Sequence, residues 1–175
     1  MERNGITWKN LLVLAIAVGG TGFVIAQAPA DDEAVFPMPQ GKVYVNECGA
    51  CHTAYAPGLL PARSWRKMMG ELGNHFGEDA SLEEPHRLAI LKDLENLAAD
   101  GPQANMRMRR ISGAIPPASA PQRVTETGYF HYMHDEVPKH FWKRKQIGTP
   151  ANCGSCHPRA NEGRYSEREI QIPPG

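Results

Sequence analysis

All four cysteines of this 175-residue chain lie in two copies of the pattern Cys-x-x-Cys-His, at residues 48–52 and 153–157. Two thiols one helical turn apart can add to the two vinyl groups of one haem, and the histidine directly after the second thiol reaches the iron from the same side. The sequence therefore predicts two covalently bound haem c groups, with His52 and His157 each as one iron ligand. The predicted attachment residues are Cys48, Cys51, Cys153 and Cys156.

Other uses of paired cysteines fit this spacing less well. Four cysteines permit three disulfide connectivities, and nothing in the sequence favours one of them. A two-pair zinc site has its second Cys-x-x-Cys about 15–20 residues after the first, whereas residues 48–51 and 153–156 are much further apart. A thioredoxin-like redox motif lies in a βαβ context, and neither copy has one. Haem attachment is the interpretation that accounts for both copies.

Residues 1–30 have the composition of an export signal. Arg3 and Lys9 flank the start of an apolar run that extends from Leu11, and residues 28–30 (Ala-Pro-Ala) have the small-x-small pattern of a cleavage site. The run is shorter than the roughly 20 apolar residues that a membrane-spanning helix needs. An uncleaved anchor is the alternative, and only then is a membrane attachment expected. Because haem c is attached outside the cytoplasm, motif and signal together predict a periplasmic protein.

The composition limits the partners and the size of the core. The chain has 19 basic and 19 acidic residues, a balance that gives no reason to expect nucleic acid as a partner. The part after the signal is long enough for one ordinary domain or two small lobes. We expect two haem-centred lobes, residues 31–110 and 111–175, with the Gly/Pro-rich loop at 113–121 next to their boundary. Two haems, which are large and flat, would add apolar surface to the core.

The hydrophobic periodicity predicts an all-α fold, mainly helical and small, with long irregular loops. A capping box at Ser81–Glu84 predicts the start of one helix, and Gly101 with Pro102 predicts its end. No segment has a convincing strand pattern, and the basic residues 107–110 are expected to lead into a loop. Helices are expected at residues 41–52, 64–76, 82–98, 127–136 and 139–145.

The second axial ligand of each iron decides its chemistry, because methionine raises the potential and an open position admits small molecules. His75 ends a helix 23 residues after His52, which allows the chain to pass from one haem face to the other. His131 and His134 lie three residues apart on one helix face, and His140 is close by, so the residues alone leave these three open for the second haem. His86 fits a solvated surface position. The methionines considered are Met38, Met68, Met69, Met106, Met108 and Met133.

Several longer runs resemble the dihaem cytochrome c (DHC-type) family. The resemblance implies small periplasmic electron carriers with two bis-histidine haems, and it implies His75 and His134 as the second iron ligands. Gly128 stands where the family usually has proline. The resemblance extends from about residue 40 to residue 174, and the runs that carry it are 59–65, 75–82, 123–130, 134–138 and 152–158.

The sequence therefore favours an electron-transfer protein, not an enzyme. It would carry single electrons from a membrane cytochrome b or reductase to a periplasmic haem protein, and the family resemblance implies a monohaem cytochrome as that acceptor. Two alternatives remain at this point. One is a dihaem peroxidase-like enzyme with one open iron, and the other is a small electron-transfer subunit of a larger periplasmic reductase.

Overall fold

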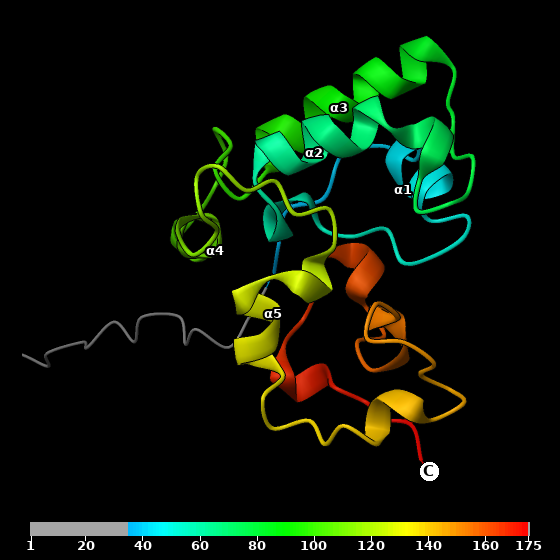
Figure 1. Cartoon of the computed structure of the whole chain (residues 1–175), viewed down its shortest axis with the longest axis vertical. Helices are drawn as coiled ribbons and strands as arrows, with labels where there is room; N and C mark the ends of the chain where they lie inside the picture. Colours follow the sequence, from blue (N-terminus) through cyan, green and yellow to red (C-terminus); the bar gives the residue numbers. More distant parts are fainter. Residues whose placement is uncertain (1–34, 175) are drawn as a thin grey trace, which may run out of the picture.

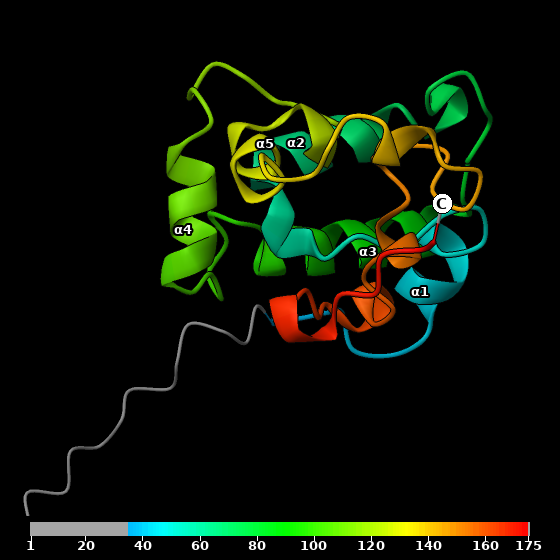
Figure 2. The same cartoon turned by 90° about the horizontal axis from the view of Figure 1, so that it is seen from below.

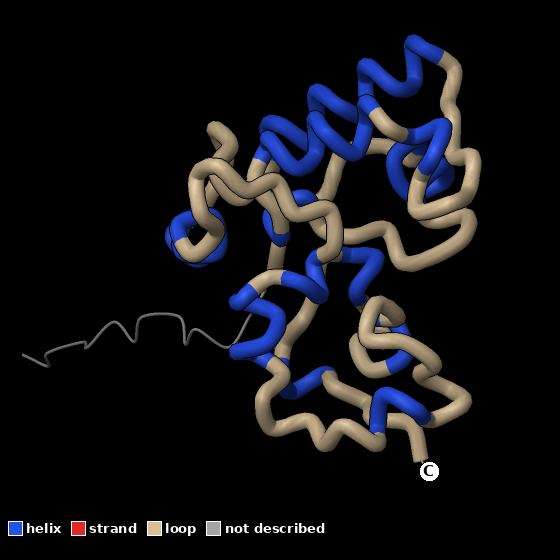
Figure 3. Tube along the Cα trace, in the orientation of Figure 1, coloured by secondary structure: helices blue, strands red, loops and turns tan. Residues whose placement is uncertain are grey.

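The computed structural model describes residues 35–174, so the predicted signal segment lies outside the described residues. Short helices and 3₁₀ turns separated by long loops make up this part of the chain, and it contains no strand (Figure 3). This confirms the all-α prediction. None of the described helices is long and apolar enough to cross a membrane. The α-helices are α1 (Val43–Cys48), α2 (Ala62–Gly70), α3 (Glu84–Leu97), α4 (Met106–Gly113) and α5 (Gly128–Met133).

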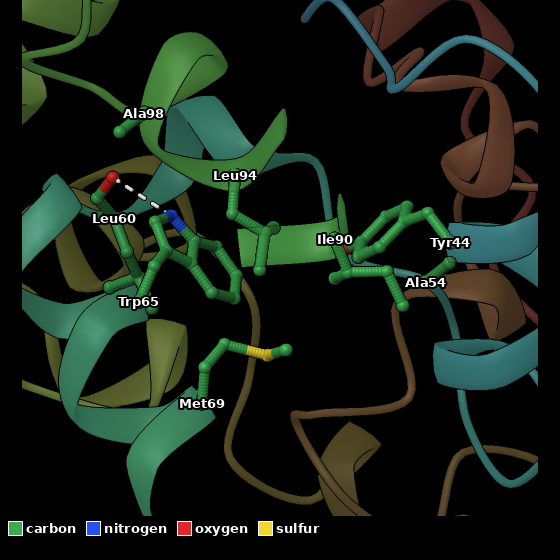
Figure 4. Close-up of a cluster of buried hydrophobic side chains, with 8 residues drawn as sticks. All are labelled: Tyr44, Ala54, Leu60, Trp65, Met69, Ile90, Leu94 and Ala98. Atoms are coloured by element: carbon green, nitrogen blue, oxygen red, sulfur yellow. Dashed lines mark hydrogen bonds between the residues drawn. The ribbon is translucent and has the colours of Figure 1, made fainter. Parts of the chain in front are cut away.

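The main apolar cluster lies between α2 and α3, which run side by side (Figure 1). Trp65 and Met69 of α2 meet Ile90 and Leu94 of α3, and Tyr44 of α1 closes the cluster (Figure 4). These side chains are spaced three or four residues apart on their helices, so each helix presents one apolar face. The indole N–H of Trp65 donates to the carbonyls of Pro57 and Leu60, at 2.8 and 3.2 Å, so its polar atom is satisfied inside the core.

A second apolar cluster connects the beginning of the described chain to α4. Phe36, Leu59, Met108 and Ile111 are buried in it, and Tyr165 packs against its edge. Helix α4 lies at one side of the molecule in both views (Figures 1 and 2). The predicted lobe boundary at residues 110 and 111 falls inside this helix. The division into lobes stays a prediction, and the packing of the second cluster crosses it.

Two local predictions were wrong. Ser81 does not cap α3: Glu83 is the N-cap and makes no side-chain cap bond. The Ser81 N–H donates to the Asp79 carboxylate at 2.9 Å, so it is not available to Glu84 as a capping box requires. Helix α4 was not predicted: it covers the basic residues that precede the loop expected at residues 113–121, and the Asn105 side chain caps it by accepting a hydrogen bond from Met108 N. In the segment 139–145 only the 3₁₀ turn Phe141–Lys143 forms.

Gly163 fixes the contact between the two ends of the described chain. Its φ is +72°, and a β-carbon there would lie 2.1 Å from the Phe36 carbonyl oxygen. The Phe36 N–H donates to the Gly163 carbonyl at 2.8 Å. Both the backbone conformation and the close approach therefore require glycine at this position.

Gly163→Ala should lower the free energy of unfolding by about 2–4 kcal/mol, since it combines an unfavourable φ with a displaced backbone contact. Gly148→Ala is the matched control, because Gly148 has nearly the same φ, +71°, and open space around it. It should cost about 1 kcal/mol. Chemical denaturation of the holoprotein measures both values. Equal losses in the two variants would contradict the role given to the Phe36 contact.

Candidate haem sites

The two Cys-x-x-Cys-His motifs fold as compact turns. Cys48 ends α1, and the following residues turn away from the helix. At the second motif the N–H groups of Cys156 and His157 both donate to the Cys153 carbonyl, at 3.2 and 2.8 Å. The four thiols form no disulfide. Burial raises the pKa of the free Cys48 and Cys153 thiols to about 11.

The first motif brings His52 opposite His75. The two ring centroids are 6.1 Å apart and the ring planes are inclined by 26°. A metal–imidazole bond is about 2.0 Å long, and ring bonds of about 1.3 Å place each nitrogen about 1.1 Å from its centroid. One iron held in line between two imidazoles therefore sets their centroids about 6.2 Å apart. The first pair matches this separation.

A tight turn holds His75 in place. The His75 N–H donates to the Glu78 carbonyl at 2.7 Å, and the Glu78 N–H donates back to the His75 carbonyl at 3.2 Å. Between them Phe76 and Gly77 have φ values of +55° and +102°, the pattern of a turn with two left-handed central residues. Such a φ is unusual for a bulky side chain. The Arg123 guanidinium lies 3.8 Å from the Phe76 ring centroid and covers this ring.

The second motif brings His157 opposite His134. Their ring centroids are 6.2 Å apart and their planes are almost perpendicular, at 84°. His134 lies directly after the last residue of α5, and its ring stacks on Phe130 at 4.2 Å and contacts Trp142 at 5.9 Å. This pair also has the separation that one shared metal ion requires.

The cap of α5 positions His134. The Thr127 hydroxyl accepts a hydrogen bond from Phe130 N at 3.2 Å and donates to the Val124 carbonyl at 2.7 Å. Thr127 is buried, with 3% of its surface exposed. The helix begins at Gly128, the position where the resembled family usually has proline. The Thr127 cap therefore defines the start of the helix in the absence of that proline.

Hydrogen bonds at Nδ1 fix one histidine of each pair. In both His52 and His134 the Nδ1 atom lies 2.8 Å from a backbone carbonyl, that of Thr53 and that of Phe130 respectively. A carbonyl oxygen can only accept, so each Nδ1 carries the proton. The Nε2 atom then has its lone pair free for a metal, which is the usual arrangement of a ligating histidine.

Burial favours the neutral form of the other two rings. It is the largest cause that lowers the pKa of His75, followed by the charges of His52 and Arg123. It also lowers the pKa of His157, with a smaller contribution from His134. Since a metal binds the neutral imidazole, these shifts favour ligation at neutral pH.

The remaining histidines have other contacts. His131 is exposed and touches the edge of Phe130 at 5.9 Å. His140 is exposed and packs against Phe141 at 4.7 Å, and His86 lies 3.4 Å from the Glu47 carboxylate. In the described part of the chain His134 is the only histidine whose ring lies next to that of His157. Which histidine ligates the second iron stays a prediction, and the geometry favours His134 over His140 and His131.

A polar junction joins the two haem-binding segments. The Tyr55 ring lies 5.2 Å from His52, and its hydroxyl donates to the Ala151 carbonyl at 2.7 Å, two residues before Cys153. The Ala54 N–H donates to the Asn161 side chain at 3.0 Å. On the other side, the Tyr165 ring lies 5.4 Å from His157. The sequence does not predict this junction, because no local pattern marks a contact across about a hundred residues.

Comparison with known proteins identifies the class. The family model for dihaem cytochrome c matches residues 44–165. A diheme cytochrome c from Rhodobacter sphaeroides is 37% identical, aligns over 75% of this chain and 100% of its own, and has a TM-score of 0.65. The diheme cytochrome type c from Shewanella baltica OS155 is 34% identical, with 78% and 95% covered and a TM-score of 0.63. No curated protein matches the chain.

The chain therefore belongs to the dihaem cytochrome c family. It carries two covalently bound haem c groups, one for each Cys-x-x-Cys-His motif, and its class is that of electron-transport cytochromes. This confirms the cofactors predicted from the motifs and the family that the longer runs resemble. Redox proteins are the partners of such a cytochrome, and c-type cytochromes are typically exported.

Tyr55 should make the fold sensitive to alkaline pH. Burial raises the pKa of Tyr55 to about 12 from the ordinary 10. The unfolded chain loses this proton first, so the contribution is complete below about pH 10 and is lost as the pH rises toward 12. Tyr55→Phe should therefore flatten the loss of stability over this pH range. Tyr132→Phe, at a ring 75% exposed, is the control and should leave the profile unchanged; identical profiles for both variants would contradict the assignment.

Proposed function

We propose that this protein is a periplasmic carrier of single electrons in which His52 and His75 hold one haem iron and His134 and His157 hold the other. The observation that supports this most directly is the separation of the two ring pairs, 6.1 and 6.2 Å. A separation of this size fits one iron held in line between two imidazoles.

Closing both irons with histidine decides what the protein does. Each haem supplies one Fe(III)/Fe(II) couple, and no coordination position is left for oxygen, peroxide or another substrate. The chain contributes rigid ligands: the turn at His75, the capped helix before His134 and the carbonyl bonds at Nδ1 hold the rings in one orientation. Histidine in place of methionine also keeps the potentials below those of a His/Met cytochrome c.

The partners follow from this role and from the family resemblance. We propose a membrane cytochrome b or a reductase as electron donor and a periplasmic haem protein, a monohaem cytochrome, as acceptor. Residues 1–30 would direct export to the periplasm. A small electron-transfer subunit of a larger reductase would use the same ligands, and co-purification with a large catalytic subunit would identify that case.

Removing either second ligand should disturb one haem alone. His75→Ala should convert the first haem, and His134→Ala the second, from low-spin to high-spin in the visible spectrum of the oxidised protein. Histidines that face no second imidazole serve as controls. His86→Ala, His131→Ala and His140→Ala should therefore leave both haems low-spin. If His134→Ala stays low-spin while His140→Ala turns one haem high-spin, His140 is the ligand.

The reduced protein should not bind carbon monoxide at neutral pH. With two histidines on each iron, added gas should leave the visible spectrum unchanged, and peroxide turnover should not exceed that of free haem. His75→Ala provides the positive control, because it opens one position and should bind one carbon monoxide per protein. Stoichiometric binding by the unmodified protein would instead support the peroxidase-like alternative.

A further inference from the structure

A strongly basic segment lies next to the second histidine pair. Between residues 137 and 158 the chain has three lysines and one arginine and no acidic residue. The three lysines, Lys139, Lys143 and Lys145, are exposed. No ion pair is found for them within the described residues. We call this set the lysine rim.

The lysine rim lies next in the sequence to a residue that contacts His134. Trp142 lies between Lys139 and Lys143 in the sequence, and its ring is half-buried, 5.9 Å from the His134 ring. Arg144 anchors the segment: its guanidinium lies 3.6 Å over Phe141 and it donates a hydrogen bond to the Pro173 carbonyl. The exposed lysines therefore lie on an anchored loop whose Trp142 contacts His134, the proposed ligand of the second haem.

The opposite charge gathers near the first histidine pair. Residues 71–86, which include His75, contain five acidic residues and no lysine or arginine; Arg87 pairs with Glu84 of this stretch and Arg123 covers its Phe76. Figure 1 shows this stretch at the upper right, whereas the segment with the 3₁₀ turn Phe141–Lys143 lies at the lower end. The acidic stretch and the lysine rim thus lie in different parts of the molecule. Separated charges of this kind orient an approaching charged protein.

We propose that the lysine rim is the docking surface for an acidic electron-transfer protein, which exchanges electrons with the second haem past Trp142. This inference rests on the proposed function. One electron would pass in each encounter: the haem that His134 and His157 would hold would give it up, and the acidic partner would be reduced by one electron. No proton or bond is transferred.

The surface suits a protein better than a membrane. A basic face that binds lipid also directs large apolar side chains outward, whereas no large apolar side chain from residue 137 to residue 150 is exposed. Separate exposed lysines around a half-buried aromatic ring instead match the rim of a transient redox contact, in which charges steer the encounter and the affinity stays modest.

The experiment compares two variants of the holoprotein. The first is Lys139→Gln/Lys143→Gln/Lys145→Gln. The second, Lys42→Gln/Lys67→Gln/Lys92→Gln, removes three exposed lysines elsewhere and is the matched control. Each protein is reduced and mixed by stopped flow with oxidised plastocyanin, an acidic one-electron acceptor, and separately with the cationic complex tris(phenanthroline)cobalt(III), over a range of salt concentrations.

The rim variant should lose roughly tenfold or more of its low-salt rate with plastocyanin, and its salt dependence should flatten. Its rate with the cobalt complex should stay the same or rise, and the control variant should keep the unmodified rate with plastocyanin. Equal losses in both variants, or no loss in the rim variant, would overturn the proposal. A membrane role would also overturn it: the unmodified protein would bind phosphatidylglycerol vesicles, and the rim variant would lose this binding but keep its rate with plastocyanin.

The visible spectrum separates this inference from the function it rests on. If the unmodified protein is high-spin or binds carbon monoxide, the closed-iron function fails whatever the lysines do. If both haems are low-spin and closed, and the rim variant still reacts with plastocyanin at the full rate, only the docking surface fails.

Discussion

A haem iron closed by two histidines needs two imidazole nitrogens in line on opposite sides of it, and most features of this fold serve that constraint. In the proposed ligation the attachment motif supplies one ring, and the chain has to return with the second. It returns in two different ways. His75 is delivered by a tight turn that includes Phe76 at a φ of +55°, whereas His134 follows a helix capped by Thr127. The ring separations are nevertheless almost equal, 6.1 and 6.2 Å.

The two sites form one structural unit because polar contacts join their binding segments. Tyr55, three residues after His52, donates to the carbonyl of Ala151, and Ala54 donates to Asn161. Phe36 pairs with the Gly163 backbone close to Tyr165, whose ring contacts His157. Each contact is worth about 1 kcal/mol on the usual scale of hydrogen bonds. Their value for function is that they hold one haem-binding segment in a fixed position relative to the other.

The sequence predicted the features that depend on short patterns. Both haems follow from the spacing of cysteine and histidine, and the apolar spacing in α2 and α3 predicted the main helices. Helix α4 was not predicted because its cap, Asn105, and its buried residues Met108 and Ile111 lie among arginines that hide its apolar face in the sequence. The false capping box at Ser81 shows the same limit, since Asp79 competes for the serine N–H. The residues could not single out His134, because its place opposite His157 depends on a tertiary contact.

Electron paramagnetic resonance of the fully oxidised protein at low temperature tests the central claim most directly. Nearly parallel imidazole planes split the iron d orbitals and give a rhombic low-spin signal, whereas perpendicular planes leave two of these orbitals nearly degenerate and give a strongly anisotropic one. With planes inclined by 26° at the first iron and 84° at the second, we expect one signal of each type in equal amounts. A high-spin signal, or two identical low-spin signals, would contradict the ligation described.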